Sequence, residues 1–235
     1  MSFDAYCRAQ RLGRGLKSLR EGEDLAGAAL DAGYDSESGF REAFGKHFGK
    51  TPGQARGAEA ATAAWLRTPL GPMIAAATSR GVCLLEFTDR RKLETQLETL
   101  GRRLKLPLVP GDHPLLDRLK SELAEYFAGE RRSFEVPLHV SGSPFQERVW
   151  QELLKIPYGQ TCSYQDVARK TGSPDAVRAV GTANGMNRIA IVIPCHRVVN
   201  KGGKLGGYGG GLWRKQRLLG LEQGQRIEGL LSESA

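Results

Sequence analysis

The chain has 235 residues, of which 40% are hydrophobic and 26% charged, a balance that is ordinary for a globular protein with one or two cores. No stretch reaches the roughly 18 apolar residues of a membrane span, and the N-terminus lacks the cationic start and apolar core of a secretory signal. Four scattered cysteines form no CxxC pair, which argues against a disulfide framework or a zinc site and favours a reducing, cytoplasmic setting.

The net charge of +8 is concentrated in one part of the chain. Residues 1–57 and 58–139 each carry one excess positive charge, whereas residues 140–226 carry 13 Lys or Arg against 5 Asp or Glu. A basic segment of this kind is typical of proteins that bind the phosphate backbone of nucleic acids. The alternative is a basic, solvated surface without a partner.

The first segment is predicted to be helical. Apolar positions at helical spacing predict a helix over residues 3–20, and a run of small residues predicts a short helix over 25–32 that ends at a glycine. Ser36 is a suitable N-cap for a further helix over residues 37–48, in which three phenylalanines recur every four residues. Two short helices about a glycine turn describe a helix-turn-helix, and a small helical core without a ligand is the alternative.

A family resemblance makes this prediction more specific. The run ALDAGYDSESGFREAF at residues 29–44, continued by FGKTP at 48–52, resembles the second helix-turn-helix of AraC-type transcription regulators. The helix before it resembles the linker helix between the two such motifs of that family. The first motif would precede Met1, so the resemblance implies a partial AraC-type helix-turn-helix over residues 1–57 with reduced promoter specificity.

The second segment is predicted to be a small α/β unit. Residues 58–68 are rich in alanine and are predicted to form a linker or a frayed helix. A hairpin is expected to turn at residues 79–81. The other elements expected here are helices over residues 91–104 and 115–127 and a strand over residues 134–138. Since no catalytic constellation is evident, residues 69–140 are predicted to be a scaffold domain.

The third segment covers residues 141–226 and is followed by a tail, residues 227–235. Ser143 is a suitable N-cap and Pro144 a suitable first helical residue. Three helices are expected, over residues 144–155, 163–170 and 175–184. The last two would form a second helix-turn-helix.

The most informative run of the chain is IVIPCHRVV at residues 191–199. Its β-branched residues predict a strand that ends at Pro194 and places Cys195 next to His196. A neighbouring imidazole and positive charge lower the pKa of a thiol and favour the reactive thiolate. The alternative is a buried, inert cysteine on a core strand.

From SPF at residues 143–145 to LLGLE at 218–222, the third segment closely resembles the active domain of O6-alkylguanine-DNA alkyltransferases, with weaker support back to about Pro69. The motifs that carry the resemblance are RAVG at 178–181, Asn187, PCHRVV at 194–199 and GY at 207–208. The whole chain resembles the C-terminal portion of Ada-type regulators, without their four-cysteine zinc module. The implied fold is mixed α/β and α: an N-terminal helix-turn-helix segment, a small RNase H-like α/β domain and a C-terminal winged-helix-like alkyltransferase domain.

The resemblance implies that Cys195 takes the alkyl group from guanine O6 in one irreversible transfer. His196 would act as base through a bridging water, and Glu222 would orient it, as in a hydrolase triad. Tyr164 would donate a hydrogen bond to the guanine as its C–O bond breaks, and Asn187 would support the loop. The base pocket that the resemblance implies is formed by Tyr208, Val198, Tyr164 and Pro194.

The implied partner is double-stranded DNA that contains O6-alkylguanine. Arg178 would fill the space that a flipped nucleotide leaves, and Ala179 and Gly181 lie on the same helix, which would enter the minor groove. We therefore expect a monomeric, single-turnover methyltransferase that repairs O6-methylguanine and O4-methylthymine without a cofactor, a metal or a membrane.

Other functions remain open at this stage. The N-terminal helix-turn-helix favours an Ada-like transcription regulator of the alkylation response. A Cys–His hydrolase is disfavoured because no oxyanion-hole glycine motif adjoins Cys195, and a non-catalytic lesion binder is disfavoured because this cysteine is present. The glycine-rich residues 202–211 lack the βαβ context of a dinucleotide-binding loop, so we expect a mobile loop that closes over the base.

Overall fold

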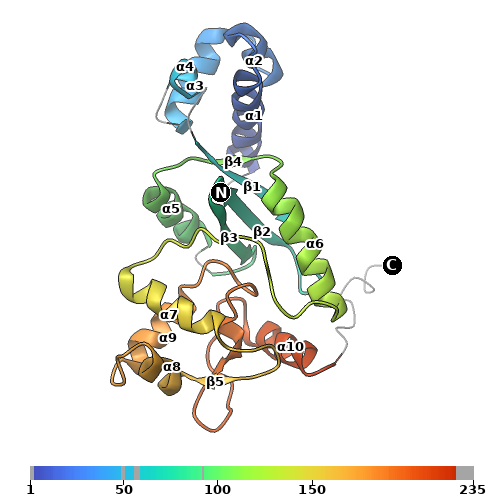
Figure 1. Cartoon of the computed structure of the whole chain (residues 1–235). Helices are drawn as coiled ribbons and strands as arrows, with labels where there is room; N and C mark the ends of the chain where they lie inside the picture. The colour runs from blue at the N-terminus through green and yellow to red at the C-terminus, as the bar shows by residue number, and fades with distance from the viewer. Residues whose placement is uncertain (1–2, 49–50, 56–58, 92, 226–235) are drawn as a thin grey trace.

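A computed structural model describes residues 3–48, 51–55, 59–91 and 93–225 (Figure 1). Three groups of elements follow one another along the molecule: N-terminal helices, a sheet with two helices, and a C-terminal group of short helices. This arrangement agrees with the predicted mixture of helical and α/β parts. The tail predicted at residues 227–235 lies outside the described residues.

Three N-terminal helices have the predicted positions: α1 (Phe3–Arg20), α2 (Leu25–Asp31) and α3 (Glu37–Phe48). The short helix α4 (Pro52–Ala55) was not predicted. Gly33 has a φ of 70°, which suits glycine in the tight turn after α2. The Ser36 hydroxyl accepts a hydrogen bond from the Gly39 amide at 3.2 Å, as expected of the N-cap of α3. Phe40, Phe44 and Phe48 are buried in a core shared with α1 and α2.

A four-stranded sheet forms the middle of the molecule, in the order β3-β2-β1-β4. The strands are β1 (Ala61–Leu66), β2 (Met73–Thr78), β3 (Gly81–Phe87) and β4 (Leu108–Pro110). Strand β1 pairs antiparallel with β2 and parallel with β4, and β2 pairs antiparallel with β3. Alternate residues of β2 join two different cores, one with α5 (Leu93–Leu104) and one with α6 (Pro114–Ala128). Both faces of the sheet are therefore covered.

The hairpin and both helices of this unit confirm the prediction, but two other expectations were wrong. Residues 58–68 were predicted as a linker, yet Ala61–Leu66 is strand β1, because its partners on both sides outweigh the weak strand preference of alanine. The strand predicted over residues 134–138 is reduced to a single bridge between Leu138 and Val82. Pro137, which has no N–H group, can only accept a hydrogen bond there, from the Val82 amide at 2.8 Å. Strand β4 was not predicted.

The C-terminal group contains short helices around an irregular loop. Its elements are α7 (Pro144–Leu154), β5 (Cys162–Ser163), α8 (Tyr164–Lys170), α9 (Val177–Gly185), the 3-10 turn η1 (Cys195–Arg197), β6 (Val198–Val199) and α10 (Leu212–Glu222). A capping box joins Ser143 and Gln146 at the start of α7, which confirms the predicted N-cap. The strand predicted to end at Pro194 is instead a turn in which Ile191 has a φ of 70°.

Contacts between the sheet unit and the C-terminal group hold the loop that precedes η1 and helix α10 in place. The Ala190 amide donates to the Leu85 carbonyl of β3 at 2.8 Å. This segment therefore pairs with the sheet through a single bridge, between Leu85 and Ile189, and does not form a separate strand. Arg214 of α10 donates hydrogen bonds to the Leu70 and Gly210 carbonyls and to both carboxylate oxygens of Asp89.

None of the described helices is long and apolar enough to cross a membrane.

Candidate active site

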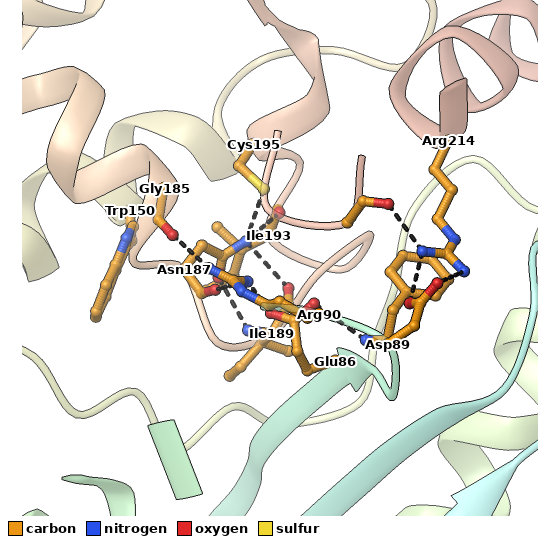
Figure 2. Close-up of polar contacts among 12 residues, drawn as sticks. Glu86, Asp89, Arg90, Trp150, Gly185, Asn187, Ile189, Ile193, Cys195 and Arg214 are labelled. Carbon is orange, nitrogen blue, oxygen red and sulfur yellow. Dashed lines mark hydrogen bonds and ion pairs between the residues drawn. The ribbon is translucent and has the colours of Figure 1, made fainter. Parts of the chain in front are cut away.

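The turn that carries Cys195 is organised by the side chain of Asn187 (Figure 2). Its Nδ2 donates to the Ile193 carbonyl at 2.9 Å and lies 3.1 Å from Cys195 Sγ, while its Oδ1 accepts from the Ile189 amide at 2.9 Å. A single amide therefore shapes residues 189–193 and contacts the sulfur. The Asn184 side chain adds a hydrogen bond to the Cys195 carbonyl at 3.3 Å.

The Cys195 thiol is buried, and its pKa is raised to about 11. Burial is the main cause and outweighs the hydrogen bond from Asn187, which favours the thiolate. Among nearby charges, Glu86 raises the pKa further, whereas Arg90 and Lys215 lower it. The predicted lowering of this pKa was therefore wrong for the resting protein, because desolvation of the sulfur exceeds the effect of the positive charges.

His196 and Glu222 form a fully buried pair. His196 Nε2 lies 2.8 Å from Glu222 Oε1, so the carboxylate holds the tautomer in which Nε2 carries the proton. Nδ1 is then an unprotonated acceptor, and it is buried without a hydrogen-bond partner among the described residues. Burial lowers the pKa of His196, although Glu222 opposes this. The arrangement presents a neutral imidazole with one nitrogen available to accept a proton.

Glu222 is held by more than the histidine. Arg197 donates from Nε to Oε2 and from Nη2 to Oε1, each at 2.9 Å, in a bidentate fork. The Tyr126 hydroxyl donates to Oε1 at 2.8 Å, and the Gly159 amide donates to Oε2 at 3.0 Å. Burial alone would raise the pKa of Glu222, but the hydrogen bonds from His196 and Arg197 and the positive charge of Arg197 lower it to about 2. The carboxylate is therefore ionised at neutral pH.

The residues predicted to surround the base lie around the same thiol. Tyr164 begins α8, and its hydroxyl donates to the Gly207 carbonyl at 3.4 Å. The Tyr208 hydroxyl is buried without a partner among the described residues. The pKa of each tyrosine is raised by burial and, secondarily, by the charge of an ionised Cys195, which marks both as neighbours of the sulfur. Pro194 and Val198, which flank η1, are buried.

The residues predicted to contact DNA lie on α9, outside the buried surroundings of Cys195. Arg178 and Ala179 are exposed on α9. A Cβ added to Gly181 of the same helix would lie 4.0 Å from the ring of Tyr164. The indole of Trp150 on α7 donates to the Ala183 carbonyl at 2.8 Å and ties the two helices together. Helix α9 thus joins an exposed surface to the buried site.

Several residues of the site were not predicted from the sequence. They are Glu86, Arg90, Tyr126, Asn184, Arg197 and Lys215. Arg197 adjoins the Cys–His pair and could have been noticed there, whereas Lys215 is one of several basic residues in α10. Its Nζ is buried and donates to the Val198 and Gly206 carbonyls. Glu86, Arg90 and Tyr126 come from the second segment, and no local pattern connects them with Cys195.

A metal would need a cluster of suitable ligands. Within the part of the chain that the structure describes, no group of three or more His, Cys, Asp or Glu side chains could hold a metal ion.

Three family models match this chain in succession. Residues 1–58 match a helix-turn-helix domain, and residues 63–140 match the ribonuclease-like domain of 6-O-methylguanine DNA methyltransferase. Residues 144–224 match the DNA binding domain of the same methyltransferase.

Curated relatives and solved structures agree with these matches. A methylated-DNA–protein-cysteine methyltransferase of Mycobacterium leprae is 42% identical over 163 residues, which are 69% of this chain and 93% of that protein. One of Mycolicibacterium paratuberculosis is 59% identical over 102 residues, but this match spans only 62% of the relative and 43% of this chain. The crystal structure of Mycobacterium tuberculosis OGT in complex with DNA is similar with a TM-score of 0.60 and 40% identity, covering 70% of this chain and 94% of that one.

Proposed function

The chain belongs to the methylated-DNA–protein-cysteine methyltransferase family, and we propose that it repairs DNA by moving a methyl group from guanine O6 to Cys195. We propose O4-methylthymine as a second substrate. The observation that carries this proposal is a buried thiol held by Asn187, next to a neutral His196 that an ionised Glu222 orients. These are a nucleophile, a base and an orienting acid.

The proposed reaction begins with the loss of the thiol proton. Because burial raises the pKa of Cys195 to about 11, the sulfur needs a base at neutral pH, and Nδ1 of His196 would receive the proton through a bridging water. Sγ then forms a bond to the methyl carbon as the bond from that carbon to O6 breaks. The electron pair of the broken bond stays on the guanine, to which the Tyr164 hydroxyl donates a hydrogen bond.

The guanine anion then takes up a proton from water, so the products are an unmodified guanine and a methyl thioether at Cys195. A neutral thioether does not readily give up its methyl group, because the Cys195 thiolate is a poor leaving group, so each molecule would act once. The protonated His196 that forms is stabilised by the carboxylate of Glu222, which Arg197 and Tyr126 keep in place. The proposal requires no cofactor.

The methylated base must leave the duplex to reach a buried sulfur, at a cost of a few kcal/mol. We assign this task to α9, with Arg178 in the space that the base vacates and with Ala179 and Gly181 allowing close approach to the minor groove. Tyr208, Val198, Tyr164 and Pro194 would enclose the base. Residues 69–140 would serve as scaffold, residues 141–226 would bind DNA and carry out the chemistry, and the protein would act as a monomer in the cytoplasm.

A second candidate function rests on the N-terminal helices. Residues 1–58 match a helix-turn-helix domain, and α2 and α3 form such a pair about Gly33. An Ada-like regulator of the alkylation response would use this pair to read a promoter. Protection of a defined promoter site from nuclease digestion, lost on mutation of exposed residues of α3, would favour this function in addition to repair.

The repair proposal is tested by the mass of the intact protein after incubation with a duplex that contains one O6-methylguanine. We expect a stoichiometric gain of one methylene, about 14 Da, because the nucleophile keeps the transferred group. Cys195→Ala should show no gain. Cys162→Ala, at a half-buried cysteine outside the proposed site, is the matched control and should gain the same mass as the wild type. An unchanged mass in the wild type, despite binding to DNA, would contradict the proposal.

A further inference from the structure

A buried ion pair from the sheet lies beneath the loop that carries Cys195. Glu86 is near the end of β3, and Arg90 lies in the loop that follows this strand. The side chain of Glu86 is 0% exposed and that of Arg90 is 9% exposed. A buried ion pair contributes little net stability, since apolar residues of similar volume often do as well or better. The position of this pair therefore suggests another role.

The guanidinium of Arg90 reaches the active-site segment through two backbone carbonyls (Figure 2). Nη1 donates to Glu86 Oε2 and, at 3.2 Å, to the Asn187 carbonyl, while Nη2 donates to the Gly185 carbonyl. Gly185 is the last residue of α9, and the Asn187 side chain contacts Cys195 Sγ. One planar group thus connects the sheet, the end of α9 and the residue that holds the sulfur.

The same guanidinium lies close to Gly209 of the glycine-rich loop, residues 202–211. A Cβ added to Gly209 would lie 2.6 Å from Arg90 Cζ and 2.8 Å from each terminal nitrogen. The hydrogen bonds of Arg90 prevent the group from moving aside cheaply. Only glycine therefore fits at this position, next to Tyr208, while Arg90 keeps its place.

We infer that the Glu86–Arg90 pair positions Asn187 and the Cys195 thiol for methyl transfer. Glu86 fixes Arg90, Arg90 fixes the backbone of Asn187, and the Asn187 amide fixes the sulfur. Both members of the pair are positioning residues, since neither donates a hydrogen bond to the sulfur. The inference rests on the proposed function, but its consequences for the free thiol can be measured without DNA.

The charges of Glu86 and Arg90 affect ionisation of the Cys195 thiol, an effect that a purely structural role of the pair would not have. The titratable and charged groups that act on Cys195 are Glu86, Arg90, Lys215, Tyr164 and Tyr208. The negative charge of Glu86 opposes ionisation of the thiol, whereas the positive charge of Arg90 favours it. Glu86→Gln leaves the positive charge of Arg90 in place, so it should favour the thiolate.

The first experiment is alkylation of Cys195 by iodoacetamide at pH 8 in the full chain, followed by peptide mass analysis. Glu86→Gln should speed alkylation of Cys195 about tenfold, which corresponds to a pKa lower by about one unit. Arg90→Gln should not speed it. The matched control is Arg118→Gln, which removes the i,i+4 partner of another buried glutamate, Glu122 of α6. Neither Arg118 nor Glu122 is among the groups that shift the pKa of Cys195, so this variant should leave the alkylation rate unchanged.

The second experiment is single-turnover methyl transfer from a duplex with O6-methylguanine. Arg90→Gln should lower the rate constant at saturating DNA about tenfold while changing the Kd for DNA less than about twofold, because a misplaced sulfur affects the chemical step. Arg118→Gln should match the wild type. Equal effects of Arg90→Gln and Arg118→Gln, or alkylation in Glu86→Gln no faster than in the control, would overturn the inference.

A double variant distinguishes the loss of positioning from a folding defect. Glu86→Leu with Arg90→Leu leaves no unpaired buried charge and should keep the thermal midpoint while still losing the transfer rate. A wild-type transfer rate in this double variant would also overturn the inference. If the wild-type protein takes no methyl group from DNA, the proposed function fails, whereas the alkylation rates still decide whether the pair acts on Cys195.

Discussion

Glu222 shows how much chemistry a single buried carboxylate can organise. It accepts hydrogen bonds from His196, Arg197, Tyr126 and the Gly159 amide, and its pKa falls from 4.5 to about 2. An ionised carboxylate is the appropriate partner for an imidazole that must take up a proton. The proposed acid–base function therefore depends on residues from four separate parts of the chain.

The lowered pKa of Glu222 predicts a dependence of stability on pH. A carboxyl whose pKa is depressed by folding stabilises the folded state above its ordinary pKa, here 4.5, and this stability is lost as the pH falls toward about 2. The contribution is on the order of 3 kcal/mol. Urea unfolding should therefore show Glu222→Gln to be less stable than the wild type at pH 7, with the gap narrowing between pH 5 and pH 2.5.

The control for this prediction is Glu37→Gln, an exposed glutamate on α3. Its stability should follow that of the wild type at every pH, because exposed ion pairs contribute little. A gap between Glu222→Gln and the wild type that stays constant down to pH 2.5 would show that folding does not lower the pKa of this carboxyl.

At the residue scale, burial also explains why the pKa predicted for the Cys195 thiol from the sequence was wrong. The Cys–His pair suggested an activated thiolate, but burial raises the pKa of Cys195 to about 11. A protonated thiol avoids reaction with adventitious electrophiles and becomes nucleophilic only when its proton is removed. Motif residues identify which groups react, whereas their pKa values depend on solvent exclusion by residues elsewhere in the chain.

At the scale of elements, the contact between α1 and β4 joins the N-terminal helices to the sheet. A Cβ added to Gly13 would lie 2.7 Å from Val109 Cγ1 and 2.8 Å from the Pro110 carbonyl oxygen. The helix and the strand therefore approach more closely than any other residue would allow. Gly45 of α3 has nothing within 4 Å of the same added atom.

These two glycines give a matched pair of substitutions. Gly45→Ala should stabilise the helix by up to about 1 kcal/mol, since alanine has the higher helix propensity. Gly13→Ala gains the same propensity but must push the helix away from a backbone carbonyl, so it should lower the thermal midpoint. Calorimetric scans of both variants would decide the sign, and a midpoint raised in Gly13→Ala would contradict the close contact.

The elements also differ in how well local sequence specifies them. Helices α1, α3 and α7 were expected because their apolar spacing and caps, such as Ser36 and Ser143, are local signals. Strand β1 was mistaken for a linker because its alanines carry no strand signal, and only its pairing with β2 and β4 makes it a strand. The turn over residues 191–194 was mistaken for a strand because its residues are mostly β-branched.

At the scale of the whole molecule, the excess positive charge lies in the part proposed to bind DNA. Residues 140–226 hold 13 Lys or Arg against 5 Asp or Glu, whereas the N-terminal helices are nearly neutral. Counterion release then predicts that affinity for an undamaged duplex falls at least about tenfold between 50 and 200 mM salt. Fluorescence anisotropy with a labelled duplex measures this slope.

Two sets of variants assign the slope to a part of the molecule. Lys170 and Arg178 are exposed at the ends of α8 and α9. Replacing both with Gln should lower the slope of log affinity against log salt concentration by about 2, as expected for the loss of two phosphate contacts. Arg41→Gln with Lys46→Gln, on α3, should leave it unchanged. A flatter slope from the second pair would show that the N-terminal helix-turn-helix also holds DNA and would favour the regulator.

The sequence by itself determined the helices other than α4 and α10, because caps and apolar periodicity are properties of neighbouring residues. Its short motifs also determined the family, and through it the candidate residues Cys195, His196 and Glu222. Only the tertiary structure decided that β1 is a central strand, that Cys195 is a protonated thiol and that Glu222 is ionised. It also brought Arg90 to the Asn187 carbonyl, 97 positions away in the chain. Burial and long-range hydrogen bonds set these features, and both exist only once distant segments have packed together.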